Sequence, residues 1–110
     1  MQRRFEQRIV NGRQRRPTHP GELLREEIMP ASGLTQARLA KALGVGRKTI
    51  SEIVLGQRPV TVDMAVRLGK FFRNGPGLWL RMQQAVDLWD VIQANRATYD
   101  KIRPMRRHAV

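Results

Sequence analysis

The sequence predicts an all-α protein, with one domain of five helices between two flexible basic termini. Successive segments repeat apolar residues at the three- and four-residue spacing of one helix face. No segment shows the strict alternation that is typical of a half-buried strand. Proline, glycine and threonine residues that suit helix ends separate these segments.

The composition bounds the size, compartment and partners of the protein. A chain of 110 residues that is 41% hydrophobic suits one compact domain. Its net charge of +12 favours polyanionic partners, namely DNA, RNA or an anionic membrane surface. The absence of cysteine excludes disulfides and thiolate metal sites, which fits a reducing cytoplasm. No apolar run approaches the roughly 20 residues of a membrane span, so we expect no membrane insertion.

The positive charge is concentrated at the two ends of the chain. Residues 1–16 have a net charge of +5, because they contain six arginines and one glutamate, and residues 101–110 add +4. The sequence therefore predicts a mobile basic arm at 1–18, a folded domain at 19–95 and a basic tail at 96–110. The arm either adds minor-groove or phosphate contacts to DNA or serves only as a solubilising tail.

The first and fourth helices are predicted from their end signals. The first covers about Gly21 to Met29, because Pro20 suits a first helical position and Pro30 is expected to stop it. Thr61 is a favourable N-cap for the fourth helix. The expected apolar stripe of that helix consists of Met64, Ala65, Leu68, Phe71 and Phe72.

The segment Leu34–Gly56 contains two short helical patterns joined by a glycine turn. Thr35 caps the first pattern, Gln36 to about Leu43, and the second covers about Arg47 to Leu55. Glycine in Gly44-Val45-Gly46 can take the positive φ of a sharp turn. The residues expected to face inward are Leu39, Ala40, Leu43, Ile50, Ile53 and Val54. This pattern predicts a helix–turn–helix, in which the second helix enters the major groove of DNA.

A fifth helix, about Leu78 to Asn95, follows the break at residues 74–77. Its apolar residues nearly surround it, and one neighbouring helix cannot cover so wide an apolar face. Exposed apolar patches usually mark a protein partner. We therefore expect homodimerisation through this helix, with an interface formed by Leu88, Trp89 and Ile92.

Several blocks of the chain resemble one known family. Leu34–Gly56 is similar to the phage-repressor, or XRE-type, helix–turn–helix. Three further blocks resemble the HigA-type antitoxins of bacterial toxin–antitoxin modules. The first is His19-Pro20-Gly21-Glu22-Leu23-Leu24, and the second is Gly56-Gln57-Arg58 together with Thr61, Met64-Ala65 and Leu68. The third is Trp79-Leu80-Arg81-Met82-Gln83. The chain departs from the family at Val86, where an aromatic residue is usual, and in its long arginine arm.

This resemblance implies a homodimer that binds a palindromic operator of double-stranded DNA in its own promoter. It also implies a partner, a small RelE-like toxin that cleaves mRNA on the ribosome and, with it, a bacterial cytoplasmic location. We expect no cofactor. The main alternative is a phage- or plasmid-type transcriptional repressor with no toxin partner. A further alternative is a protein-interaction module that inhibits its partner and does not bind DNA.

The expected DNA-binding residues are Gln36, Arg47, Lys48, Thr49, Ser51, Glu52 and Arg58. The resemblance to phage repressors places positions 36, 47, 48 and 52 at the DNA. Arg47 and Lys48 begin the second helix of the motif, where they can reach base edges, and arginine can bind guanine O6 and N7 together. Gln36 and Arg58 are expected at backbone phosphates.

The other expected contacts are less specific. Thr49 can bind a phosphate or touch a thymine methyl group, and Ser51 lies one turn further along the helix. Glu52 can accept from cytosine N4 or instead orient Arg47 or Lys48. The alternative for every residue of this set is an ordinary solvated surface position.

The sequence contains no set of residues suited to catalysis or metal binding. Its two histidines, His19 and His108, lie at opposite ends of the chain, so we expect His19 to cap or pack and expect no metal site. The turn Gly44-Val45-Gly46 follows no strand and is therefore no nucleotide-binding loop. We expect no enzyme, and we expect Trp79 and Trp89 to lie in the core or an interface.

Overall fold

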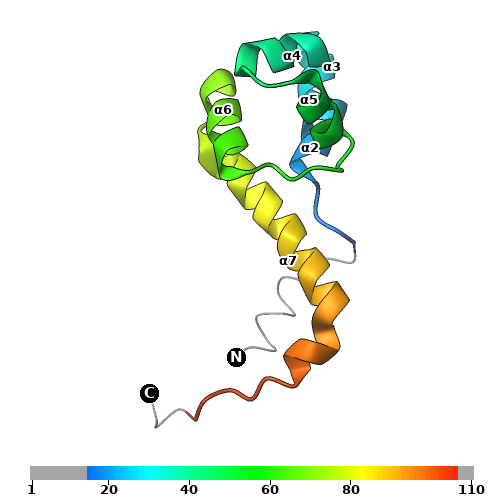
Figure 1. Ribbon diagram of the computed structural model, residues 1–110, viewed down its shortest axis with the longest axis vertical. Helices are drawn as coiled ribbons and strands as arrows, with labels where there is room; N and C mark the ends of the chain where they lie inside the picture. Colours follow the sequence, from blue (N-terminus) through cyan, green and yellow to red (C-terminus); the bar gives the residue numbers. More distant parts are fainter. Residues whose placement is uncertain (1–14, 107–110) are drawn as a thin grey trace. The chain divides into compact units, whose positions relative to one another are not determined.

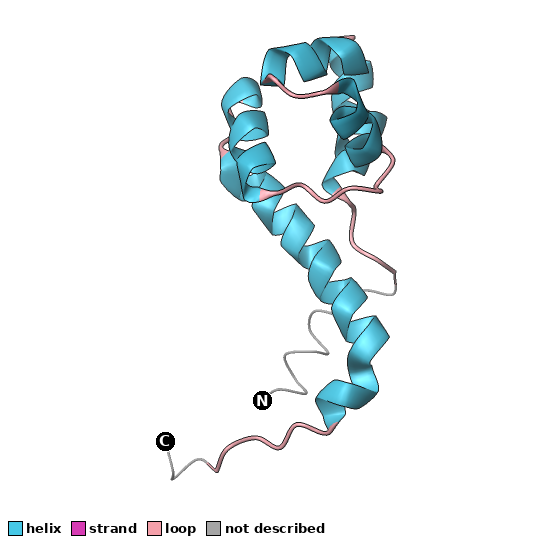
Figure 2. Cartoon of the chain, viewed as in Figure 1, coloured by secondary structure: helices cyan, strands magenta, loops and turns pink. Residues whose placement is uncertain are grey.

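The computed structural model describes residues 15–106, which form helices and connecting loops without a strand (Figure 2). The elements are α2 (Pro20–Leu23), η2 (Leu24–Ile28), α3 (Met29–Ser32), α4 (Gln36–Leu43), α5 (Arg47–Val54), α6 (Val62–Phe72) and α7 (Pro76–Asp100) (Figure 1). Because α2, η2 and α3 are successive parts of one helix, the described residues form five helices. The predicted all-α fold is confirmed.

The first helix continues through Pro30, where the sequence predicted its end. Its N-cap is His19, whose Nδ1 accepts a hydrogen bond from the Gly21 backbone N–H at 2.9 Å, so the expected capping role is confirmed. The π-helical segment η2 directly precedes α3, which contains Pro30. A proline ring clashes with the carbonyl four residues earlier in a regular α-helix, and the wider π-turn relieves that clash. The helix ends at Gly33, which has a left-handed φ of 70°.

The structure divides into two compact units, which are described separately. One extends from Pro17 to Val86, and the other includes Arg16 and the chain from Asp87 onward. In the second unit the Arg16 guanidinium donates two hydrogen bonds to the Asp90 carboxylate, at 2.8 and 2.7 Å. Residues 1–14 of the predicted arm and 107–110 of the predicted tail lie outside the described residues.

Helix α7 begins earlier than the sequence predicted, and a kink interrupts it at the predicted end. It begins at Pro76, two residues before the expected start at Leu78, because proline suits the first turn of a helix. Asn95 has non-helical dihedral angles, with φ −127° and ψ 21°, yet the helix resumes and ends at Asp100. The predicted end at Asn95 is therefore a break within the helix. None of the described helices is both long and apolar enough to cross a bilayer.

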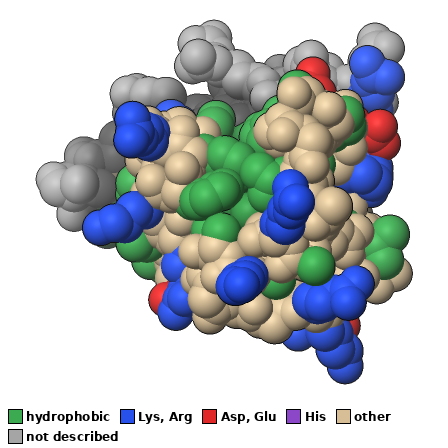
Figure 3. Space-filling view, turned by 90° about the horizontal axis from the view of Figure 1, so that it is seen from above, with side chains coloured by type: hydrophobic (Ala, Val, Ile, Leu, Met, Phe, Trp, Pro, Cys, Tyr) green, Lys and Arg blue, Asp and Glu red, His purple; other side chains and the backbone are tan. Residues whose placement is uncertain are grey.

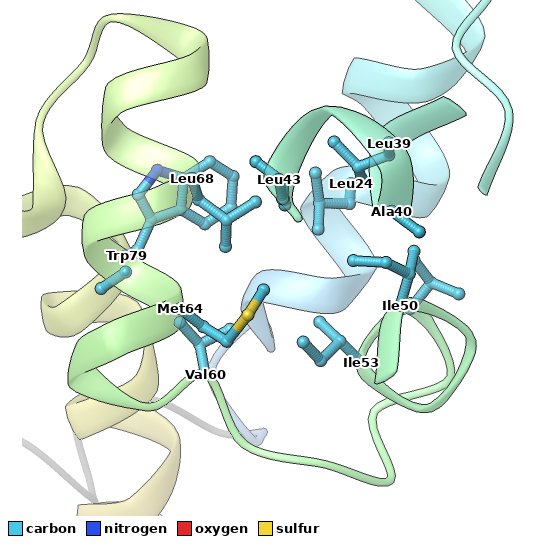
Figure 4. Packing of buried hydrophobic residues seen from close by; sticks show 12 residues of the cluster. Leu24, Leu39, Ala40, Leu43, Ile50, Ile53, Val60, Met64, Leu68 and Trp79 are labelled. Carbon is cyan, nitrogen blue, oxygen red and sulfur yellow. The ribbon is translucent and has the colours of Figure 1, made fainter. Parts of the chain in front are cut away.

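The core of the Pro17–Val86 unit lies between the helix–turn–helix and the helices that flank it. Figure 4 shows side chains of α4 and α5 meeting Leu24 and facing Met64, Leu68 and Trp79. All residues predicted to face inward in Leu34–Gly56 are buried: Leu39, Ala40, Leu43, Ile50, Ile53 and Val54. Isolated helices of eight residues are unstable in water, so this burial, at about 1.5–3 kcal/mol for each large side chain, holds α4 and α5 together.

The prediction for α6 is confirmed except at its last turn. Thr61 caps the helix, because its Oγ1 accepts a hydrogen bond from the Met64 backbone N–H at 3.2 Å. Met64, Ala65 and Leu68 are buried as predicted. Phe71 remains 40% exposed, contrary to the prediction. It lies in the last turn of α6, where its ring packs edge-on against Phe72 with 4.9 Å between centroids.

The apolar face of α7 is better covered in a single chain than its sequence suggests. Trp79, Val86 and Ile92 are buried, and Leu88 and Trp89 are partly buried. Val91, at 41% exposed, is the one exposed large hydrophobic residue of α7. Part of the apolar face of this helix is therefore covered within one chain, and Leu88, Trp89 and Val91 retain exposed surface. The other exposed large hydrophobic residues of the described chain are Leu55, Val62, Val66, Phe71, Ile102 and Met105.

Gln83 and Trp79 connect α7 to the rest of the Pro17–Val86 unit through polar atoms. Gln83 is only 6% exposed, and its Oε1 accepts a hydrogen bond from the Val60 backbone N–H at 2.8 Å. Trp79 is fully buried, and its Nε1 donates to Asn74 Oδ1 at 3.1 Å. The expectation that Trp79 belongs to the core is confirmed.

Replacing Gln83 by methionine is expected to lower the free energy of unfolding by about 1–3 kcal/mol, since it leaves the buried Val60 N–H without its acceptor. Urea denaturation followed by circular dichroism measures this loss. The matched control is Gln84→Met on the exposed side of the same helix, which should change stability by less than about 0.5 kcal/mol. Equal effects of the two substitutions would contradict the role given to Gln83.

Candidate nucleic-acid interface

The turn between α4 and α5 is closed by backbone hydrogen bonds. Gly44 has a left-handed φ of 72°, and its N–H donates to Lys41 O at 3.2 Å. The Val45 N–H donates to Ala40 O at 3.0 Å. These two bonds form a Schellman-type end that satisfies carbonyl groups of the last turn of α4. The chain then turns directly into α5, whose N-cap is Gly46.

Arg47 and Lys48 lie in the first turn of α5 and project into solvent. Both are exposed, and neither forms an ion pair or side-chain hydrogen bond within residues 15–106. Their positive charges are thus available to a ligand. Ser51 and Glu52 lie one turn further along α5, and both are partly buried, whereas Ile50, Ile53 and Val54 are buried.

Glu52 is paired with Arg58 instead of with Arg47 or Lys48. Its Oε1 accepts hydrogen bonds from Arg58 Nε at 2.8 Å and Nη2 at 2.6 Å. Of the two alternatives for Glu52, the pairing with Arg47 or Lys48 is not seen among the described residues, because the loop after α5 brings a different arginine to it. Both side chains are part-exposed, so the pair contributes little to stability, and its main effect is to fix Arg58 beside the C-terminal half of α5.

The remaining predicted residues occupy the positions that the sequence suggested, with partial burial. Gln36 is the first residue of α4, after the N-cap Thr35, whose Oγ1 accepts from the Arg38 N–H at 3.1 Å. Gln36, Thr49 and Ser51 are each partly buried. All seven predicted DNA-binding residues belong to the Pro17–Val86 unit. Figure 3 shows one face of the molecule, on which Lys and Arg side chains surround a central area of hydrophobic side chains.

Two arginines outside the motif contact its backbone, and no pattern in the sequence predicts either contact. Arg25 donates from Nη1 to Val54 O at the end of α5, at 2.6 Å. Arg67 donates from Nη1 to Leu43 O at the end of α4, at 2.7 Å. The last carbonyl groups of a helix lack hydrogen-bond partners within the helix and carry partial negative charge. A guanidinium supplies both the hydrogen-bond donors and the positive charge that these groups favour. The spacing of Asp63 and Arg67 indicates an ion pair along α6, but it does not indicate the carbonyl contact.

Comparison with known proteins assigns the fold and the family. Residues 24–79 match a family model described as helix-turn-helix. The chain is 43% identical to an HTH-type transcriptional regulator of Haemophilus influenzae over 70% of this chain and 72% of that protein. It is 36% identical to the antitoxin HigA-1 of Vibrio cholerae over 83% of this chain and 86% of that protein.

Solved structures agree with these relatives. The antitoxin HigA of Pseudomonas aeruginosa, solved with the higBA promoter, is 37% identical and superposes with a TM-score of 0.78, covering 83% of this chain and all of that chain (100%). The antitoxin GraA in complex with its operator is 36% identical with a TM-score of 0.77, covering 84% of this chain and 94% of that one. The chain therefore belongs to the helix–turn–helix family and, within it, to the HigA-type antitoxins.

Proposed function

We propose that this protein is a dimeric autorepressor that binds a palindromic operator through α5 and neutralises a RelE-like, mRNA-cleaving toxin. The observation that carries the DNA-binding part is the pair of exposed charges of Arg47 and Lys48 at the start of α5, which have no ion-pair partner among the described residues. Two relatives of this fold, HigA of Pseudomonas aeruginosa and GraA, are solved with promoter or operator DNA, which supports the same ligand here.

In this proposal the predicted residues divide into base readers and backbone contacts. Arg47 and Lys48 reach base edges in the major groove, with Thr49 and Ser51 beside them. Gln36 at the start of α4 and Arg58 after α5 bind phosphates, where they fix the register of the protein on the duplex. Glu52 holds Arg58 by the two hydrogen bonds at 2.8 and 2.6 Å, so it acts on the backbone contact more than on a base.

The test of DNA binding is a titration with the DNA directly upstream of the protein's own coding sequence. The control duplex has the same length and base composition in scrambled order, and both titrations use one salt concentration, because phosphate contacts make affinity depend on salt. The proposal expects the upstream DNA to bind at least about 1,000-fold more tightly than the scrambled duplex. Equal affinities for the two duplexes would contradict the proposal that the upstream DNA contains an operator for this protein.

The dimer is proposed to form along α7, at Leu88, Trp89 and Ile92. Leu88 and Trp89 are partly buried in the single chain, and Val91 beside them is 41% exposed. Ile92 is already only 4% exposed, so Leu88, Trp89 and Val91 have more surface left to bury against a partner. Two-fold symmetry of the protein matches the two half-sites of a palindromic operator.

Sedimentation equilibrium at micromolar concentration is expected to give twice the chain mass of 12.7 kDa. Trp89→Ala should shift the protein toward the monomer, because it removes the largest apolar side chain from the proposed interface. Trp79→Ala is no suitable control, since Trp79 lies in the core, whereas Ile102→Ala removes an exposed residue outside the interface. A wild-type monomer at this concentration would contradict the dimer.

The toxin partner is supported by the family and by the relative that is named an antitoxin. Co-expression with the product of a small adjacent gene is expected to restore growth that the same product arrests alone, and the two proteins should co-purify. A protein that binds its upstream DNA but neither rescues growth nor co-purifies with any neighbouring product would favour the alternative, a phage- or plasmid-type repressor without a toxin.

A further inference from the structure

Arg67 of α6 makes a bridge from its own helix to the turn of the helix–turn–helix. Its Nε donates to Asp63 Oδ2 at 2.8 Å, one turn earlier in α6. Its Nη1 donates to Leu43 O at 2.7 Å and lies 3.4 Å from Gly44 O. One planar guanidinium thus connects a carboxylate of α6 with the last carbonyl groups of α4, and its rigid fork fixes the direction between them.

The part of α6 that carries Arg67 is held in place by the core. Leu68, the next residue of α6, is fully buried in the core, and Met64 and Ala65 are buried one turn earlier. Asp63 holds the guanidinium from the same helix, so the side chain loses little further freedom when it binds the turn. The bridge is 39% exposed on the arginine side and 70% exposed on the aspartate side, so it contributes little to overall stability.

The far end of the bridge is the element that sets the direction of α5. Gly44 is left-handed, with a φ of 72°, and a Cβ at this position would lie 3.3 Å from Arg67 Nη1. Two residues later Gly46 caps α5, and Arg47 and Lys48 follow at once. A small rotation at Gly44 therefore changes where the first turn of α5 points relative to Gln36 at the start of α4.

From this geometry we infer that Arg67 is a positioning residue for DNA recognition, which fixes the turn so that α4 and α5 meet the operator together. The inference rests on the proposed DNA binding. It assigns Arg67 a role different from that of the DNA-contacting residues, because its guanidinium joins the Asp63 carboxylate of α6 to the Leu43 carbonyl at the end of α4.

The experiment compares Arg67→Met with Lys70→Met, which removes one positive charge from an exposed position of the same helix. Affinity for upstream and scrambled DNA is measured at 25 °C and at several salt concentrations. Arg67→Met is expected to lower the affinity for upstream DNA about tenfold, comparable to the loss of one base contact. Its affinity for scrambled DNA and its salt slope should match those of Lys70→Met.

Two other outcomes would show that Arg67 is instead a phosphate contact or has a purely structural role. A salt slope reduced by about 1, with equal loss on both DNAs, would show that Arg67 is a phosphate contact and would overturn the inference. An unchanged ratio of the two affinities, with only the melting temperature lowered, would show a purely structural role and would also overturn it. Arg67→Lys keeps the charge but not the fork, so its ratio of the two affinities should fall as that of Arg67→Met does, while its affinity for scrambled DNA should stay at the wild-type value.

A second variant keeps the test valid if Arg67→Met folds poorly. Asp63→Asn leaves Arg67 in place and weakens only its support, so a smaller fall in the ratio of affinities is expected. If the wild-type protein itself binds both DNAs equally, the proposed DNA binding has failed. If the wild type discriminates and both variants discriminate equally well, only the role of Arg67 has failed.

Discussion

Replacing Gly21 by alanine is expected to lower the free energy of unfolding by more than about 3 kcal/mol, a large part of the stability of a small domain. Gly21 is buried at the start of α2, where that helix crosses α5. A Cβ at this position would overlap the carbonyl oxygen and carbon of Ile53, and it would lie 3.1 Å from His19 Nδ1. Because the obstructing atoms are backbone of α5, no side-chain rotation relieves the overlap.

The two helices would have to separate, which opens the core around Leu24 and Ile53, both fully buried. Urea denaturation followed by circular dichroism measures the loss. Gly46→Ala is the matched control, because a Cβ there meets nothing within 4 Å and the residue does not have a positive φ. It is expected to change stability by less than about 1 kcal/mol. A Gly21→Ala protein as stable as Gly46→Ala would contradict the close crossing of α2 and α5.

The double substitution Arg47→Ala/Lys48→Ala is expected to lower the affinity for the operator by about 100-fold or more. A good contact to a base edge is worth about 1–3 kcal/mol, and the variant loses two side chains placed to make such contacts. Affinity for scrambled DNA should fall much less, because many other charges supply the non-specific attraction. The fold should be unaffected, since both side chains are exposed and form no ion pair within the described residues.

Fluorescence anisotropy with labelled duplexes measures both affinities. The double variant Arg38→Ala/Lys41→Ala is the control, because it removes the same charge from exposed positions of α4. The control variant should lose only the affinity that results from the electrostatic attraction of its two lost positive charges. A fall of less than about threefold for Arg47→Ala/Lys48→Ala, or equal falls for both variants, would mean that α5 does not read the bases.

The elements that the sequence predicts best are those whose signals are local. The start of α4 at Gln36 follows from Thr35, which caps it, and its end at Leu43 follows from Gly44, which takes the left-handed conformation. The three apolar residues of α5 share one helix face and are buried together. These features depend on short spacing along the chain, so periodicity and capping rules detect them.

The features that the sequence does not reveal depend on distant parts of the chain. Pro30 carries a strong signal to end a helix, yet the π-turn of η2 allows the helix to continue past it. Arg25 and Arg67 bind backbone carbonyls 29 and 24 residues away, and such contacts leave no periodic trace. The pairing of Glu52 with Arg58 depends on the path of the loop after α5, which charge patterning along one helix does not describe.

The most direct test of the account is a base-substitution profile of the operator, measured with the wild-type protein and with Arg47→Ala. Each base pair of one half-site is replaced in turn, and the affinity of both proteins is measured at one salt concentration. For the wild type, at least one guanine should be discriminated by about 1–3 kcal/mol, and Arg47→Ala should lose the penalty at that position only. Identical profiles for the two proteins would contradict the claim that α5 reads the operator.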